Sequence, residues 1–283
     1  MTAVRAVIAA MGSELGPDVL ARCRELFAAE QDALRAAVVP SAVDCVYGPH
    51  ERHRLDIYGA HDFAGPRPVV LFVHGGGFRM GDKGGIDQWP NAAVGRMAAR
   101  AGFVGAVMNY RLLPDAAWPS GGEDVIAAID WLRAHVADHG GDPERIVVVG
   151  TSAGSVHVAT ALKLRADLPV RGIVLLSGLY GYTPLDDKDV PYYGEQALYA
   201  ARMPREAVAA TTLPLFVGCA EYDPPRFQAE FLGLMAERLA RHGAMPRGYI
   251  ASGHNHYSMA MHLGTSDRRL ADEIAGFVEA ICV

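Results

Sequence analysis

Short apolar runs alternate with helical patterns along most of this chain, and this alternation limits the fold more than any other feature. Continuous apolar strands that are separated by helices favour a mostly parallel sheet with helices on both faces. The first two runs are only four residues apart and can pair as an antiparallel hairpin at one edge. The sequence therefore predicts an α/β fold. The expected strands are residues 43–48, 53–59, 69–73, 103–110, 146–150, 172–177, 213–219 and 247–251.

The helical period is clearest in the segment after residue 121. Val125, Ile129 and Leu132 recur at spacings that place them on one face, and Gly140 follows as a stop signal. The other helical patterns have a similar length and lie between strands. The expected helices are residues 88–101, 122–138, 154–166, 225–242 and 267–281.

Two segments interrupt the alternation. Residues 13–37 form a helical pattern before the first strand, and residues 178–212 are an aromatic and polar insertion with several helix breakers. Long ordered connections are usually functional. We therefore expect a single domain over residues 1–283, with a small lid built from residues 1–42 and 178–212. The alternative is a packing helix and a long surface connection.

Composition excludes several classes of protein. The chain has 283 residues, 51% of them hydrophobic, and a formal net charge of −6, so the basic stripe of a nucleic-acid binder is not expected. No run approaches the roughly 18 apolar residues of a membrane span, and the start of the chain does not resemble a signal peptide. Cys23, Cys45, Cys219 and Cys282 are scattered, which is typical of reduced thiols. We expect a cytoplasmic protein.

A serine lies between two glycines at the end of one expected strand. Gly150, Ser152 and Gly154 in "VVGTSAGS" form G-x-S-x-G between an aliphatic run and a helical pattern. In a nucleophile elbow the glycines allow a sharp strand-to-helix turn that exposes the serine hydroxyl near free backbone N–H groups. Ser152 is therefore the candidate nucleophile.

A second glycine-rich stretch follows another expected strand. His74 precedes Gly75, Gly76 and Gly77, and these glycines let backbone N–H groups approach a ligand closely. Together with the N–H of Ala153, the N–H groups of Gly76 and Gly77 would form an oxyanion hole. A phosphate-binding loop would need a Lys-Ser/Thr pair that is missing here. We interpret His74 as a structural hydrogen-bonding residue.

A serine nucleophile also needs a base, which in this chain order should follow a late strand. His254 and His256 both come just after the expected strand 247–251, and either can accept the serine proton. His157 and His262 are expected to be packing or surface residues.

The acid should follow the preceding strand and fix the imidazole. Glu221 and Asp223 both lie at the end of the run 213–219, and Pro224–Pro225 then begins a helix. Spacing alone leaves both carboxylates open.

These motifs together resemble the α/β-hydrolase carboxylesterases of the hormone-sensitive-lipase-like group and the related kynurenine-formamidase-like esterases. The resemblance covers residues 43–280. It rests on "YGPHERHRLDIYG", "HGGGF", "NYRLLPDAAWP", "GGDPERIVVVGTSAGS", "EYDPPR" and "GHNHYS", in the order of that family.

The resemblance implies an α/β-hydrolase fold and narrows the site. It places the acid at Asp223, the base at His256 ahead of Tyr257, and the oxyanion donors at Gly76, Gly77 and Ala153. Two departures, Thr151 before the serine and "YRLLPD" where relatives often have "YRLAPE", affect the acyl pocket and not the triad. The short lid segments argue against a triglyceride pocket.

The implied activity is that of a serine carboxylesterase that hydrolyses small to medium acyl or aryl esters through an acyl-enzyme. An arylformamidase with the same triad is the alternative among enzymes, and a ligand-binding protein on a hydrolase scaffold is the alternative outside them. We expect a small-molecule ester substrate, no metal or organic cofactor, no nucleic-acid or membrane partner, and a possible homodimer through residues 225–242 or the last strand. Five tyrosines of the insertion either line the substrate pocket or pack the lid: Tyr180, Tyr182, Tyr192, Tyr193 and Tyr199.

Overall fold

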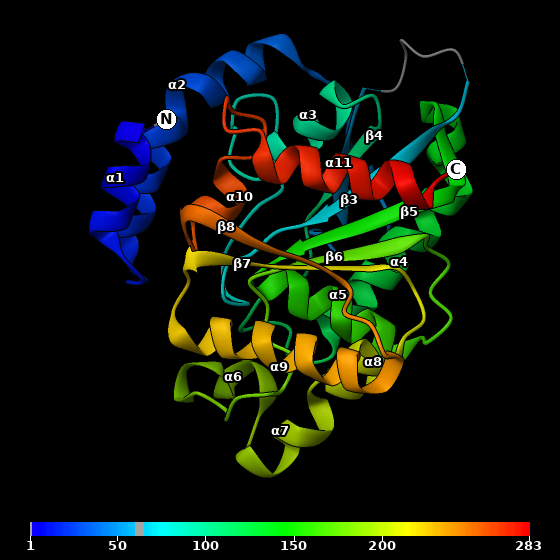
Figure 1. Cartoon of the computed structure of the whole chain (residues 1–283). Helices are drawn as coiled ribbons and strands as arrows, with labels where there is room; N and C mark the ends of the chain where they lie inside the picture. The colour runs from blue at the N-terminus through cyan, green and yellow to red at the C-terminus, as the bar shows by residue number, and fades with distance from the viewer. Residues whose placement is uncertain (1, 60–64) are drawn as a thin grey trace.

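An eight-stranded sheet forms the centre of the computed structural model, which describes residues 2–59 and 65–283 (Figure 1). Each strand overlaps one of the eight expected runs. The strands are β1 (Pro40–Val46), β2 (Arg54–Tyr58), β3 (Arg67–Val73), β4 (Val104–Met108), β5 (Gly141–Thr151), β6 (Gly172–Leu176), β7 (Leu215–Tyr222) and β8 (Arg247–Asn255).

The order of the strands across the sheet is β1-β2-β4-β3-β5-β6-β7-β8. β2 is antiparallel to both β1 and β4, and all the other neighbours are parallel. The mostly parallel sheet and the antiparallel pair at its edge are therefore confirmed. Because the carboxyl ends of β5, β7 and β8 share one edge, the residues that follow these strands lie near one another.

Helices cover both faces of this sheet (Figure 1). The expected helices are all present, with several shifted boundaries, and further short helices occur at the start of the chain and in the insertion. The helices are α1 (Thr2–Met11), α2 (Pro17–Ala37), α3 (Ala92–Arg100), α4 (Ser120–His135), α5 (Ala153–Leu164), α6 (Val190–Tyr193), α7 (Gln196–Arg202), α8 (Arg205–Ala210), α9 (Pro225–His242), α10 (Ser258–Met261) and α11 (Arg269–Ile281), with 3-10 turns at Val136–His139 and Asp187–Asp189.

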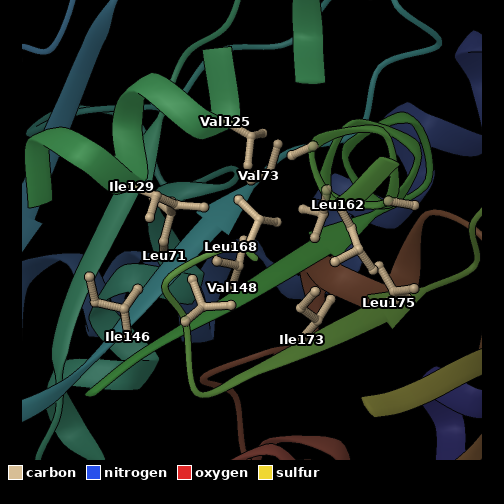
Figure 2. Packing of buried hydrophobic residues seen from close by; sticks show 14 of the residues in the cluster. Leu71, Val73, Val125, Ile129, Ile146, Val148, Leu162, Leu168, Ile173 and Leu175 are labelled. Atoms are coloured by element: carbon tan, nitrogen blue, oxygen red, sulfur yellow. The ribbon is translucent and has the colours of Figure 1, made fainter. Parts of the chain in front are cut away.

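Two apolar cores lie between the sheet and its helices. Leu71 and Val73 of β3 point into the core beneath α4 and α5, where Figure 2 shows Val73 near Val125 and Leu71 near Ile129. The alternate residues Val70 and Phe72 belong to the other core, beneath α3 and α11. Since both faces of β3 are buried, its sequence is continuously apolar. Burial of each such side chain stabilises the fold by about 1.5–3 kcal/mol.

The structure differs from the expected helices in three places. α1 was not predicted as a helix, because its short alanine-rich run has no capping signal. α3 begins at Ala92, four residues later than expected, since Asn91 has a φ of 63°. The insertion is helical in α6, α7 and α8, which are too short for a helical period to be recognised.

The two expected lid segments lie on different parts of the molecule. α1 contacts β8, and α2 contacts α3 and α10. The insertion packs against α5 and α9 through α8. A lid function for residues 1–42 and 178–212, within one domain of residues 1–283, stays a prediction; residue 1 and residues 60–64 of that domain lie outside the described residues. None of the helices in the described ranges is long and apolar enough to cross a bilayer.

Candidate active site

Ser152 occupies a sharp turn between β5 and α5. Its backbone angles are φ 52° and ψ −121°, a strained combination for a residue with a side chain. A Cβ on Gly150 would lie 2.7 Å from the backbone carbon of Gly154, and a Cβ on Gly154 would collide with the Val73 carbonyl oxygen. Both glycines are therefore required by close backbone packing, as a nucleophile elbow demands.

The structure brings Ser152, His256 and Asp223 together at the carboxyl edge of the sheet. Ser152 Oγ lies 2.9 Å from His256 Nε2, and His256 Nδ1 lies 2.7 Å from Asp223 Oδ1. Asp223 follows β7 and His256 follows β8, so the sheet topology positions all three side chains. Both distances are those of hydrogen bonds in a serine–histidine–aspartate triad.

The surroundings of Asp223 keep its carboxylate fixed. The side chain is fully buried, and its Oδ2 accepts hydrogen bonds from Ser177 Oγ at 2.6 Å and from the Ala220 N–H at 2.7 Å. The ring of Phe227, at the start of α9, lies 4.3 Å from the His256 ring. Ser177 and Phe227 were not predicted from the sequence. For Phe227, an aromatic residue four positions after the acid was an available signal.

The two competing sequence candidates lie elsewhere. His254 Nε2 is 3.3 Å from Asp267 Oδ2, and burial lowers the pKa of His254 to about 4. Glu221 accepts hydrogen bonds from the Gly253 N–H at 2.7 Å and from Ser252 Oγ at 2.9 Å. These bonds, the backbone one first, lower the pKa of Glu221. Neither side chain contacts Ser152 in the described part of the molecule.

The glycine loop after β3 lies against the elbow. A Cβ on Gly75 would be 3.1 Å from Ser152 Cβ, so the loop backbone passes directly beside the serine. Gly76 and Gly77 have φ values of 138° and 58°, and a Cβ on Gly76 would collide with the Met80 carbonyl oxygen. The N–H groups of these two glycines donate to no other residue in the described ranges. They are therefore available to a ligand.

Ala153 is the first residue of α5, so its N–H has no acceptor within the helix. It directly follows Ser152 and is buried. A free backbone N–H beside a nucleophile and at a helix N-terminus favours negative charge.

Two buried histidines support the glycine loop without joining the triad. His74 Nδ1 donates to the Gly75 carbonyl oxygen at 2.7 Å, and its ring stacks on Tyr110 at 4.4 Å. His157 Nδ1 lies 3.2 Å from the hydroxyl of Tyr192. Burial lowers the pKa of His74 to about 4 and that of His157 to about 3, so both rings are neutral near pH 7. Their geometry agrees with structural and packing roles.

The insertion contributes an aromatic cluster beside the elbow. Its members are buried and contact the first turn of α5 and the glycine loop. The ring of Tyr192 stacks on Phe78 at 3.9 Å, one residue beyond Gly77. Tyr180 is buried in a different core, against α9, and Tyr182 is only partly buried there. The cluster consists of Phe78, Ala153, Val156, Leu179, Tyr192, Tyr193, Tyr199, Met203 and Phe227.

Glu230 on α9 holds the first residues of the insertion. Its buried carboxylate accepts hydrogen bonds from four successive backbone N–H groups, those of residues 180–183, at 2.6, 3.0, 3.1 and 2.8 Å. Arg226, one turn earlier on α9, forms a 2.6 Å ion pair with Asp189. The sequence reading missed both residues. A glutamate between the apolar positions Phe227 and Phe231 was the available signal.

One surface cavity lies away from this site. It has a volume of about 380 Å³ and is lined by residues at the amino ends of β3 and β5, including Pro66 and Asp142. Chemistry in such sheets takes place at the carboxyl ends. Within the described ranges, no three His, Cys, Asp or Glu side chains are grouped closely enough to hold a metal ion.

The sequence of this chain is similar to a family model and to several known esterases. The family model BD-FAE matches residues 55–169, which include the glycine loop and the elbow. A probable isoprenylcysteine alpha-carbonyl methylesterase from Oryza sativa subsp. japonica is 39% identical over 127 residues, covering 45% of this chain and 28% of its own length. Carboxylesterase NlhH from Mycobacterium tuberculosis (strain ATCC 25618 / H37Rv) is 32% identical over 220 residues, covering 65% of this chain and 66% of that protein. The chain thus spans less than a third of the methylesterase.

A crystal structure of esterase B from Lactobacillus rhamnosis aligns with a TM-score of 0.70 at 19% identity, over 95% of this chain and 97% of that chain. The sheet topology and this likeness define the α/β-hydrolase fold, so the predicted fold is confirmed. The two relatives are a carboxylesterase and a probable methylesterase by name, and the predicted resemblance to the α/β-hydrolase carboxylesterases is confirmed with them.

Proposed function

We propose that this protein is a serine carboxylesterase that hydrolyses small to medium acyl or aryl esters. The observation that carries the proposal is the continuous hydrogen-bonded chain from Ser152 Oγ through His256 to the buried Asp223. The names of the relatives support the same reaction class. NlhH is a carboxylesterase, and the rice protein is a probable methylesterase.

The chemistry assigns one step to each side chain. His256 Nε2 takes the proton of Ser152 Oγ as that oxygen attacks the ester carbonyl carbon, and the carbonyl oxygen becomes an oxyanion. The N–H groups of Gly76, Gly77 and Ala153 would bind this oxyanion. His256 then returns the proton to the leaving alcohol, and an acyl-enzyme remains on Ser152.

Water completes the reaction by the reverse sequence. His256 accepts a proton from water, the resulting hydroxide attacks the acyl carbon, and Ser152 leaves with the proton that His256 returns. Asp223 holds the Nδ1–H tautomer throughout and stabilises the imidazolium in each step. All atoms and protons come from ester, water and these residues.

The test is hydrolysis of p-nitrophenyl butyrate together with fluorophosphonate labelling. Wild-type protein should turn over the ester and carry the label on Ser152, and Ser152→Ala should lose both while keeping the wild-type melting temperature. A Ser152→Ala protein that still hydrolyses the ester would overturn the proposal. Ser41→Ala, on the β1 edge far along the sheet, is the matched control for loss of a serine hydroxyl.

Two further assignments accompany this function. We infer a cytoplasmic location, supported by the four cysteines, all of which are unpaired thiols. We also infer a homodimer, supported by exposed apolar side chains on the two elements named for it, Leu232 and Leu239 on α9 and Ile250 on β8. Sedimentation velocity of wild type and Leu232→Glu tests the dimer, which the substitution should dissociate.

A further inference from the structure

A second aspartate–histidine–serine set lies beside the turn that carries His256, with His254 at the end of β8, Ser258 at the start of α10 and Asp267 shortly before α11. His254 Nε2 is 3.3 Å from Asp267 Oδ2, and His254 Nδ1 is 3.1 Å from Ser258 Oγ. All three side chains are buried, Ser258 completely. A hydroxyl with no exposure cannot reach an ester, so this set needs an explanation other than catalysis.

The hydroxyl of Ser258 closes a turn around His256. Ser258 Oγ accepts a hydrogen bond from the Asn255 N–H at 2.9 Å, and Asn255 Oδ1 accepts one from the Ser258 N–H at 3.0 Å. These reciprocal bonds fix residues 255–258, and His256 lies inside the turn that they define. The position of the catalytic ring therefore depends on this turn.

His254 sets the direction of the Ser258 hydroxyl. The buried imidazole is neutral near pH 7, since burial lowers the pKa of His254 to about 4. A neutral ring has one N–H, and that N–H is best placed on Nε2, where Asp267 accepts it. Nδ1 is then an acceptor for the Ser258 proton, which leaves the lone pairs of Ser258 Oγ for the Asn255 N–H.

The N-terminal helices and α11 hold this set from outside. Arg5 of α1 lies 3.2 Å from Asp267 Oδ2, and Arg269 of α11 lies 2.7 Å from the same atom. Cys23 Sγ of α2 lies 3.5 Å from Asn255 Oδ1. Gln31 of α2 donates to the backbone carbonyls of Met261, the last residue of α10, and of Leu263 just after it, at 2.8 and 2.9 Å. Helices from the two ends of the chain thus converge on this set and on the turn beside it.

We propose that Ser258 and His254 are positioning residues, which fix the turn 255–258 so that His256 Nε2 stays within hydrogen-bond distance of Ser152 Oγ. The N-terminal helices, expected as a lid, serve as the outer support of this turn. The proposal rests on the proposed function, in which His256 is the base. A displacement of about 1 Å in a reacting group can lower a rate by about 10²-fold.

The test compares Ser258→Val with Ser258→Thr, because valine and threonine have nearly the same shape and differ in the hydroxyl. Ser258→Val should lower kcat for p-nitrophenyl butyrate by about 10²-fold, with KM nearly unchanged. Ser258→Thr should keep most of the wild-type kcat. His254→Phe, which retains a ring without an acceptor nitrogen, should resemble Ser258→Val.

A signal that is independent of turnover completes the test. The low-field proton NMR resonance of the His256 Nδ1–H, bonded to Asp223, should persist in Ser258→Thr and weaken or vanish in Ser258→Val. If folded Ser258→Val and Ser258→Thr have equal kcat and the same low-field resonance, the positioning role is wrong. If the wild type hydrolyses no ester, the proposed function fails, and the resonance still decides the positioning role.

Discussion

Two aspartate–histidine–serine sets, whose histidines are His256 and His254, differ in access and in the partners of their serines. Ser152 is partly exposed, and among the described side chains its Oγ forms a hydrogen bond with His256 alone. Ser258 is completely buried, and its Oγ also bonds the backbone of Asn255. The first serine has free backbone N–H groups beside it. The same three residue types therefore fit different roles, and access, an uncommitted hydroxyl and nearby N–H donors are what support Ser152 as the proposed nucleophile.

The two sets should differ most in how much kcat falls when their histidines are replaced. His256→Gln removes the base, so kcat should fall by about 10⁴-fold or more, with little change in the free energy of unfolding. His254→Gln should lower kcat by no more than about 10²-fold and destabilise the fold. Steady-state kinetics and urea unfolding of both variants measure this. An equal loss of kcat in the two would contradict the assignment of roles.

Replacement of Asp223 should lower kcat far more than replacement of Asp267, although the loss should not exceed that of His256→Gln. Asp223→Asn keeps the shape of the acid but favours the wrong imidazole tautomer, so kcat should fall by about 10⁴-fold. Asp267→Asn should chiefly lower the melting temperature, since Arg5 and Arg269 lose their shared partner. Calorimetry and kcat are the measurements. Loss of activity without loss of stability in Asp267→Asn would be the contrary result.

Stability should fall in mild acid because of the buried histidines. Burial lowers the pKa of His254 to about 4 and that of His262 to about 3, both below the usual value of about 6.5. The unfolded chain therefore binds protons that the native chain does not, and stability present above about pH 6.5 is lost as the pH falls toward 4. We expect at least about 2 kcal/mol lower unfolding free energy at pH 5 than at pH 7. Urea titrations check this, with Ser152→Ala as a control that should show the same slope.

The smallest change in kcat is expected for Ser177, whose hydroxyl donates a hydrogen bond to Asp223. Ser177→Ala removes one hydrogen bond to Asp223 Oδ2 and leaves the Ala220 N–H bond in place. Because one donor remains, kcat should fall by only about tenfold, equivalent to about 1.4 kcal/mol. Steady-state kinetics of Ser177→Ala and Asp223→Asn, measured side by side, separate the loss of one hydrogen bond from the loss of the carboxylate. A loss as large as that of Asp223→Asn would mean that Ser177 has a direct part in the reaction.

The strands and the elbow could be predicted because local sequence dictates them. Continuous apolar runs such as the one in β3 need two covered faces, and Gly150 and Gly154 are required by backbone contacts that any such turn makes. The short helices of the insertion depend on tertiary contacts, among them those of Glu230. No local sequence pattern predicts these short helices.

Residue types and spacing left the choice between neighbouring candidates open, and only the family resemblance favoured Asp223 and His256, because the choice depends on where two strands end. His254 and His256 both follow the same apolar run, but β8 continues to Asn255, so His254 belongs to the strand and His256 to the turn beyond it. β7 likewise continues to Tyr222, which leaves Glu221 in the strand and Asp223 after it. A shift of two residues in a strand end decides which carboxylate and which imidazole reach the edge of the sheet.

The carboxylate of Glu230 binds the main chain of residues 180–183, and a main-chain contact does not depend on which side chain is attached. Every residue except proline supplies the N–H that it needs. Except at Gly181, whose φ of 111° favours glycine, and at the buried Tyr180, substitutions in this stretch can therefore reshape the neighbouring surface while the path of the chain stays constant. Such a segment is a natural place for related enzymes to diverge in what they accept, and a good first target for a mutant library.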